Sequence, residues 1–225
     1  MALLGRAVMI NWSDVPVEHR AEYYAWHDRE HMAGRLRVAG FQRGRRHLAL
    51  DADRDVFNLY EVDDLSVLTG GAYAKLTEQP SEASRRVGKL IVNAVRALAQ
   101  VEFTTGTGVG AYVHTLRFDA AEGQGAALMP WLRGRLSEIA AVDGAVAAHL
   151  CVADREASSA VTPERRGRPT SVPYWSVIIE GISADAVRSA GALLDERTLA
   201  AKGAAAPVAR GTYALQRLVA RADVA

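Results

Sequence analysis

The sequence predicts an α+β fold in which one order of elements, β-α-β-β-α-β, occurs twice in tandem. Two observations lead to this prediction. Apolar runs with strand composition alternate with helical stretches in the same order on both sides of a glycine-rich segment, residues 104–110. The similar turns RVAGF and AVDGA also place Gly40 and Gly144 about 104 residues apart. We therefore expect two ferredoxin-like repeats, at residues 1–105 and 109–225.

Start and stop signals divide each repeat into its elements. In the first repeat Pro16 suits a first helical turn, Gly40 ends that helix, and DADRD suits a hairpin turn. The first repeat is expected to have strands at 7–12, 41–50, 56–62 and 97–104 and helices at 17–37, 65–78 and 81–95. The second is expected to have strands at 111–118, 145–152, 174–180 and 211–219 and helices at 125–141 and 184–202.

One connection differs between the repeats. The polar segment 153–173 stands where the first repeat has only a short turn. Such a segment is either a mobile lid or a disordered insertion, and its composition favours the disordered insertion.

Composition excludes several classes of protein. With 225 residues and 49% hydrophobic residues the chain can bury a sizeable core, so it is neither disordered nor fibrous. A net charge of +1 gives no general attraction to nucleic acid. Cys151 is the only cysteine, which excludes an intrachain disulfide and suits a reducing, cytoplasmic setting. The chain has no apolar window long enough to span a membrane, and its N-terminal apolar run indicates a strand, not a signal peptide.

The predicted sheets require a cover. Helices on one face of a four-stranded sheet leave the other face bare, and the second repeat can cover it, giving a barrel-like interior with the helices outside. Concave space of this kind often binds small molecules. On the strand at 41–50, Arg43, Arg45 and His47 share one face and Arg46 lies on the other, so the sequence leaves open which face points inward.

A resemblance to a known family rests on residues 26–47, W-H-x-x-E-H-M-x-x-R-L-x-x-x-G-F-x-R-x-R-R-H. This run resembles the signature of the dimeric α+β barrel superfamily and, more narrowly, of its EthD-like members. Subunits of that superfamily are typically single copies that dimerise. The resemblance therefore implies two tandem ferredoxin-like βαββαβ repeats that form a pseudo-dimeric α+β barrel. His47 stands where similar sequences often have tyrosine, and Ala33 and Gly34 replace an expected proline-containing turn.

The superfamily includes cofactor-independent monooxygenases, isomerases, polyketide cyclases, dehydratases and haem-handling enzymes. The resemblance thus implies a small-molecule enzyme that performs acid/base chemistry on an aromatic or polyketide-like substrate without a cofactor. The alternatives are a non-catalytic barrel that binds a small ligand or haem, and a structural assembly module. A homodimer of the tandem chain is a further possibility.

His27, Glu30 and His31 match the zinc-binding spacing H-x-x-E-H. We do not expect a metal, because no third ligand is evident and the order of elements is ferredoxin-like. On a straight helix His27, His31 and Arg35 fall opposite the apolar side. His31 can therefore reach a site only if the helix end bends near Gly34.

We predict that His31 is the acid/base residue and that Arg45 and His47 position the substrate or stabilise an oxyanion. Each has a structural alternative: a hydrogen bond at the helix end for His31, and a charged, solvated edge strand for the arginine cluster. The substrate-binding candidates are Arg35, Arg43, Asn58, Tyr60, His27 and His149.

The two repeats are not chemically equivalent. The offset of about 104 residues places His31 on Arg135, Arg45 on His149 and His47 on Cys151. A site that depends on His31 would therefore be present once per chain.

Overall fold

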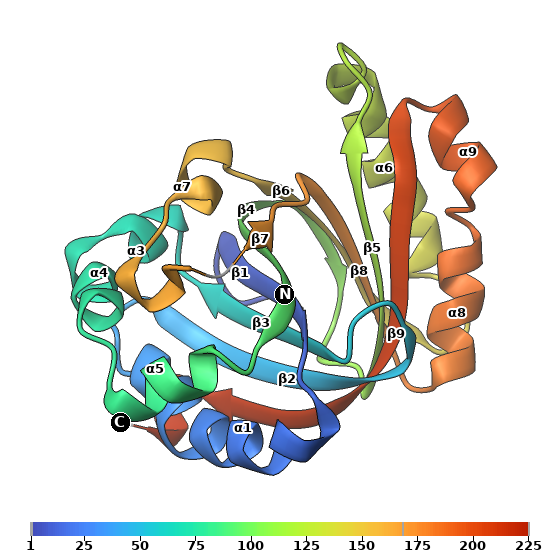
Figure 1. Ribbon diagram of the computed structural model, residues 1–225. Helices are drawn as coiled ribbons and strands as arrows, with labels where there is room; N and C mark the ends of the chain where they lie inside the picture. Colours follow the sequence, from blue (N-terminus) through green and yellow to red (C-terminus); the bar gives the residue numbers. More distant parts are fainter. Residues whose placement is uncertain (1, 168, 225) are drawn as a thin grey trace.

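In the computed structural model, which describes residues 2–167 and 169–224, eight antiparallel strands close into a barrel with helices on its outside (Figure 1). The first half supplies β1 (Ala7–Asp14), β2 (Phe41–Ala52), β3 (Val56–Val62) and β4 (Val92–Gly106). The second supplies β5 (Tyr112–Ala120), β6 (Ala145–Ala153), β8 (Trp175–Gly181) and β9 (Ala204–Ala220). A short strand, β7 (Thr170–Ser171), pairs in parallel with β4.

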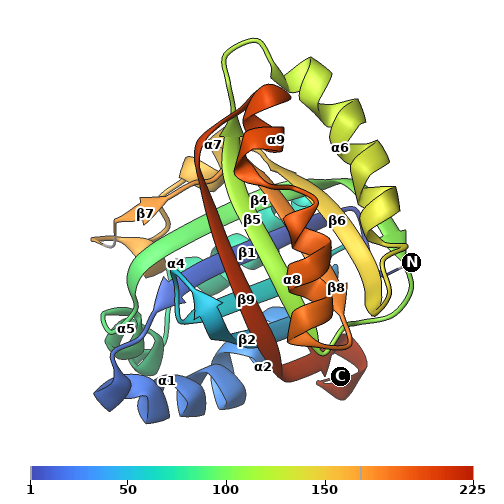
Figure 2. The same cartoon turned by 90° about the vertical axis from the view of Figure 1, so that its right-hand side faces the viewer.

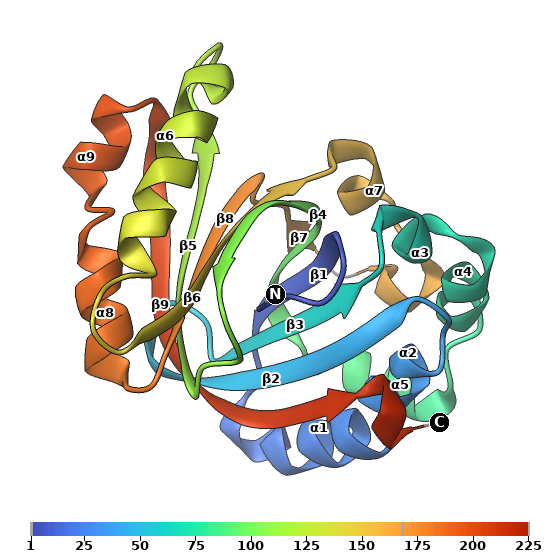
Figure 3. The same cartoon turned by 180° about the vertical axis from the view of Figure 1, so that it is seen from behind.

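The strand order shows how the halves combine. Within the halves the orders are β4-β1-β3-β2 and β9-β5-β8-β6, the ferredoxin-like arrangement. The pairs β2–β9 and β4–β6 then join the two sheets into one barrel. In Figures 2 and 3 the long strands β9 and β4 run from one sheet across to the other. The predicted pseudo-dimeric α+β barrel is therefore confirmed.

Helices cover the outer face of each sheet. In the first half they are η1 (Val17–His19), α1 (Arg20–Trp26), η2 (His27–His31, a π-helical turn), α2 (Met32–Leu36), α3 (Leu65–Thr69), α4 (Gly71–Glu78) and α5 (Glu82–Gly88). Over the second sheet lie α6 (Gly125–Ile139), α8 (Ala184–Ala192) and α9 (Glu196–Ala201). The second half of the chain also forms α7 (Arg155–Ser159), η3 (Pro163–Arg165) and η4 (Arg221–Asp223), which contact β4, the helices α4 and α5, and β2 of the first half, respectively. None of the described helices is long and apolar enough to cross a membrane.

Two expectations about elements are corrected. The helix expected at 81–95 ends at Gly88, and β4 begins at Val92 because residues from there on pair with β1. A short apolar run fits either element, which explains the error. The favoured disordered insertion is also wrong for the described part of 153–173, which forms α7, η3 and β7. A hydrogen bond attaches this segment to β4, because Ser158 Oγ accepts from the backbone N–H of Leu98 at 2.9 Å.

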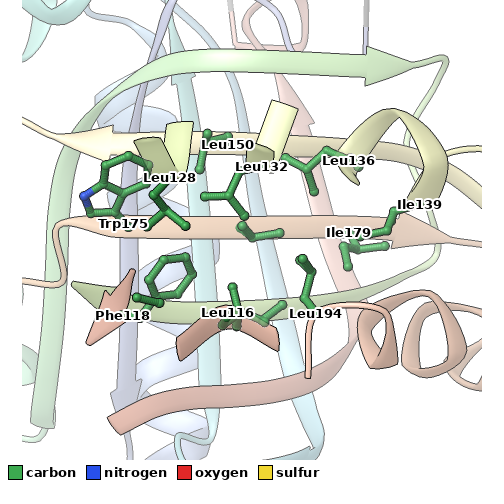
Figure 4. Packing of buried hydrophobic residues seen from close by; sticks show 14 of the residues in the cluster. Leu116, Phe118, Leu128, Leu132, Leu136, Ile139, Leu150, Trp175, Ile179 and Leu194 are labelled. Atoms are coloured by element: carbon green, nitrogen blue, oxygen red, sulfur yellow. The ribbon is translucent and has the colours of Figure 1, made fainter. Parts of the chain in front are cut away.

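The sheet separates two kinds of core. The barrel interior packs apolar side chains from both halves, among them Ile10, Trp12, Phe57, Leu59, Ile178 and Tyr213. Between the second sheet and its helices lies another apolar core, in which the leucines of α6 lie beside Leu150 of β6 and the apolar residues of β8 (Figure 4). Arg45 and His47 contact Glu180 and Phe57 inside the barrel, whereas Arg46 reaches the helix layer. The face of β2 that carries Arg45 therefore points inward.

Candidate active site

A cavity of about 90 Å³ lies between the first sheet and its helices. The helical segment 20–36 contributes Tyr23, Trp26, His27, His31 and Arg35 to its lining. The outward faces of β3 and β4 contribute Asn58, Tyr60 and Arg96. Five of the predicted site residues, His27, His31, Arg35, Asn58 and Tyr60, thus lie around one space.

The π-helical turn η2 explains why both histidines reach this cavity. In the second half, α6 buries Leu128, Leu132 and Leu136 at regular four-residue steps. In the first half the corresponding buried residues are Tyr23, His27 and Met32, with a five-residue step across η2. The wider turn gains one residue and rotates His27 onto the sheet. The expectation from a straight helix, that His27 faces away from the core, is therefore wrong.

His27 is held as a neutral imidazole of defined tautomer. Its Nδ1 lies 3.0 Å from the Arg46 guanidinium and its Nε2 3.1 Å from Tyr60 Oη. Because guanidinium only donates, Nδ1 accepts and Nε2–H donates to the tyrosine oxygen. Burial, together with the charges of Arg46 and Arg35, holds the pKa of His27 well below its usual value.

Tyr60 remains a hydrogen-bond donor toward the cavity. Burial raises the pKa of its hydroxyl, so the phenol keeps its proton. The oxygen already accepts from His27, which leaves the O–H proton to point elsewhere. Since Tyr60 lines the cavity, an oxygen atom of a bound molecule is a suitable acceptor.

His31 lies beside this pair. Its Nδ1 is 3.0 Å from the Arg35 guanidinium, which donates to it. Its ring lies over Trp26, with centroids 4.1 Å apart, and stacks on His27 at 5.1 Å. The predicted acid/base residue thus sits between an aromatic wall and an arginine.

Asn58 and Tyr23 form a second polar pair at the cavity. The Asn58 amide donates to Tyr23 Oη at 3.1 Å, while burial raises the pKa of Tyr23 to about 12. Among the described residues, buried Asn58 Oδ1 has no hydrogen-bond partner. An acceptor left without a partner in a buried site suits a ligand that brings a hydroxyl or amide donor.

Sequence reasoning missed Arg96, a buried arginine on β4 that lines the cavity. The available signal was a charged residue inside the apolar run VNAVRALAQV. Arg96 lies between the helix expected at 81–95 and the strand expected at 97–104, so the sequence pattern assigned it to neither element.

The other predicted site residues lie on the opposite face of the sheet, inside the barrel. Arg45 pairs with Glu61 at 3.0 Å and with Glu180 at 2.8 Å. Arg43 pairs with Glu61 at 2.8 Å, and His149 Nε2 lies 3.1 Å from Glu180. These side chains form one buried network that joins the two halves.

His47 is in the same interior. Its Nδ1 lies 3.3 Å from the carbonyl oxygen of Phe57, and burial with the nearby Arg45 charge lowers its pKa to about 3. The structure does not bring Arg45 or His47 together with His31, because the sheet separates them. We therefore leave both out of the cavity's chemistry.

Neither ring nitrogen of His27 is available to a haem or a metal. Its Nδ1 accepts from Arg46 and its Nε2–H donates to Tyr60, whereas an axial ligand needs a free nitrogen lone pair. Glu30, the third member of the H-x-x-E-H pattern, accepts from Ser84 Oγ at 2.9 Å. Within the described residues no group of three metal-ligating side chains occurs.

The closed barrel of two ferredoxin-like halves defines a dimeric α+β barrel fold contained in a single chain. No family model matches the sequence, and no curated protein matches it. Solved structures do match over nearly the whole chain. An anthrone oxidase-like protein is 12% identical, with a TM-score of 0.68 over 97% of this chain and 94% of its own.

Two further structures are similar. A candidate monooxygenase from Fusobacterium nucleatum is 12% identical, with a TM-score of 0.63 over 96% of this chain and 95% of its own. Another from Lactobacillus acidophilus is 10% identical, with a TM-score of 0.60 over 97% of each chain. At these identities the similarity shows the fold alone.

Proposed function

We propose that the chain is a small-molecule enzyme whose active site is the first-half cavity, and that it performs acid/base chemistry on an aromatic or polyketide-like substrate without a cofactor. The observation that carries the proposal is the pair of histidines, each with a defined arginine partner, in a cavity with aromatic walls. The EthD-like resemblance of residues 26–47 and the structural similarity to oxidase-like and monooxygenase-like proteins support the same class.

The first step would be removal of a proton from the substrate. Arg35 turns toward a substrate oxygen, which frees Nδ1 of His31 to accept a proton from an acidic C–H or O–H group. The electron pair left behind moves onto a carbonyl or phenol oxygen, where the Tyr60 hydroxyl donates to it. Monooxygenase, cyclase, dehydratase and isomerase chemistry can each follow from such an enolate or phenolate.

His27 and Arg46 would act as positioning residues. Arg46 fixes the tautomer of His27, and His27 then orients the Tyr60 hydroxyl toward the cavity. The chain thus holds a donor in place before substrate arrives, which lowers the cost of reorganisation in the reaction.

Proton abstraction can be tested without knowing the final product. We suggest 2-hydroxyacetophenone as the probe, with exchange of its methyl protons in D₂O followed by proton NMR and its binding followed by thermal shift. His31→Ala should slow exchange by about 10²- to 10⁴-fold. Arg135→Ala, at the position equivalent to His31, is the matched control and should leave exchange unchanged. Undiminished exchange in His31→Ala would overturn the acid/base assignment.

A further inference from the structure

Arg96 stands out among the buried arginines. It is only 7% exposed and lines the cavity. Arg45, Arg46 and Arg117 are equally buried, and each pairs with a carboxylate. Within the side chains that the structure describes, Arg96 has no ion pair, and its guanidinium makes a single hydrogen bond, to the Met9 sulfur at 3.6 Å.

A thioether is a weak acceptor and does not compensate a buried positive charge. Moving a guanidinium out of water without an anionic partner is unfavourable, so such groups normally have one. Because Arg96 opens onto the cavity, the missing anion is most simply supplied by what binds there.

Neighbouring side chains extend this site across the sheet. Asn11 is the register partner of Arg96 on one side and of Asn58 on the other, so the three form a polar row over β4, β1 and β3. All three line the cavity. The row can therefore present a cation at one end and the unpartnered Asn58 Oδ1 at the other.

The second half provides a matched comparison. By the same registers the equivalent row is Arg210, Leu116 and Val177. There the arginine donates to the carbonyl oxygen of Leu194, and the other two positions are apolar core. Both halves carry an arginine at this position, but Arg96 lines the described cavity, whereas Arg210 donates to a backbone carbonyl.

We propose that Arg96 recognises a carboxylate of the substrate, which makes the substrate class a small aromatic acid, with Asn58 accepting from a hydroxyl on the same molecule. The proposal rests on the cavity being the substrate site. A guanidinium fork binds a carboxylate through two parallel hydrogen bonds, which fixes the orientation of the ring beside His31 and Tyr60.

The test compares two probes that differ in one charge, 4-hydroxybenzoate and methyl 4-hydroxybenzoate, by calorimetry at pH 7 with the full chain. The wild type should bind the acid about 10- to 100-fold more tightly than the ester, the range expected for a charge-assisted contact. Arg96→Met should remove this preference. Arg96→Lys should restore part of it, because the charge is kept and the fork is lost. Arg210→Met, the matched control, should keep it.

The outcomes separate the two proposals. Equal affinity of the wild type for acid and ester, or a preference that survives Arg96→Met, would overturn recognition by Arg96 and leave the active-site assignment standing. Failure of the wild type to bind either probe would overturn both. Thermal unfolding without ligand adds a second readout: Arg96→Met should unfold at the same or a higher temperature than wild type, because an uncompensated charge has been removed. A lower temperature would show a structural role and contradict the proposal.

Discussion

The first half of the barrel holds a polar cavity where the second half holds a packed apolar core. Strand registers make the comparison position by position: Arg46, Asn58 and Tyr60 in the first half correspond to Leu150, Val177 and Ile179 in the second. All three pairs lie on the helix-facing side of the sheet. The same backbone arrangement therefore supports either a site or a core, and a few side chains on one face decide which.

The first helix of each half shows the same contrast. Leu128 and Leu132 fill the space above the second sheet, and the π turn brings Tyr23 and His27 to the corresponding places above the first. A π turn is locally less favourable than an α-helix and is often retained at functional sites. Among the helices that the structure describes, the π turn occurs only beside the first-half cavity, which supports a functional origin.

The second half also contributes directly to the first. Its segment between β6 and β8 crosses to the first half, where Arg165 and Thr170 line the cavity and β7 pairs with β4. The second half thus supplies part of the wall of the first-half cavity.

Inside the barrel the halves remain alike, and the largest effect is expected there. Glu180 corresponds to Glu61, and it pairs with Arg45 and His149 and accepts from the backbone N–H of Gly110. Glu180→Ala removes the carboxylate that Arg45 and His149 share in the buried interior. We expect it to lower the free energy of unfolding by about 3–5 kcal/mol. Chemical denaturation measures this cost, and a single transition is expected because both halves share the sheet.

The control is Glu102→Ala, which removes a partly exposed ion pair with Arg133 and should cost under about 1 kcal/mol. Two separate transitions in Glu180→Ala, or a loss as small as that of the control, would show that the halves fold independently of this network.

Much of this architecture could be predicted from the sequence. Apolar runs bounded by turn residues located most of the strands, and the 104-residue offset that aligned Arg45 with His149 and His47 with Cys151 agrees with the observed registers. These apolar runs can be recognised in the sequence because every barrel strand must bury at least one face.

The site was less predictable for three physical reasons. Both faces of β2 carry charged residues, and buried ion pairs allow Arg45 to face inward as readily as Arg46 faces the helices. Helical periodicity assumes the same number of residues in every turn. Because η2 contains an extra residue, the periodicity placed His27 on the solvent side, whereas the side chain faces the sheet. Arg96 became a candidate only because it lines the cavity, and the cavity is formed by segments distant in the sequence, which no local sequence pattern predicts.

Substitutions at corresponding helix positions test the contrast between the polar cavity of the first half and the apolar core of the second. Leu132→Ala opens a cavity in the packed half and should cost about 2–5 kcal/mol of stability. His27→Leu gives the first half the residue type of the second and should cost less, about 1–2 kcal/mol of stability, since the hydrogen bonds with Tyr60 and Arg46 are exchanged for apolar packing. The same variant should lose binding of phenolic ligands. Retained binding in His27→Leu would contradict the role given to the His27–Tyr60 pair.

Each half buries a neutral histidine between its sheet and its helices, His27 from η2 and His114 from β5, which predicts a pH dependence of stability. Burial, with Arg210 and Arg188 nearby, lowers the pKa of His114 to about 4, and the pKa of His27 is also well below its usual value. Between about pH 4 and the unfolded pKa of about 6.5, the unfolded chain binds more protons than the folded one. Stability should therefore rise with pH across this window and level off above it.

His114→Gln should flatten this rise, by on the order of 2 kcal/mol between pH 4 and 6.5, because one titrating group is removed. Unfolding free energies at several pH values provide the measurement. An unchanged slope would show that the pKa of His114 is the same in the folded and the unfolded chain, and would contradict the prediction.

The smallest effect is expected where the second half's segment attaches to the first. Ser158 is fully buried, and its Oγ accepts from the N–H of Leu98 and donates to the same residue's carbonyl at 3.2 Å. Ser158→Ala leaves that N–H without its partner, at a cost of about 1 kcal/mol or slightly more. If the segment is part of the cavity wall, the variant should also weaken binding of a phenolic ligand several-fold, since Arg165 and Thr170 lose their anchor. Ser159→Ala, one residue further, should change neither quantity. Full ligand affinity in a Ser158→Ala protein of reduced stability would show that the second half covers the cavity of the first without shaping it.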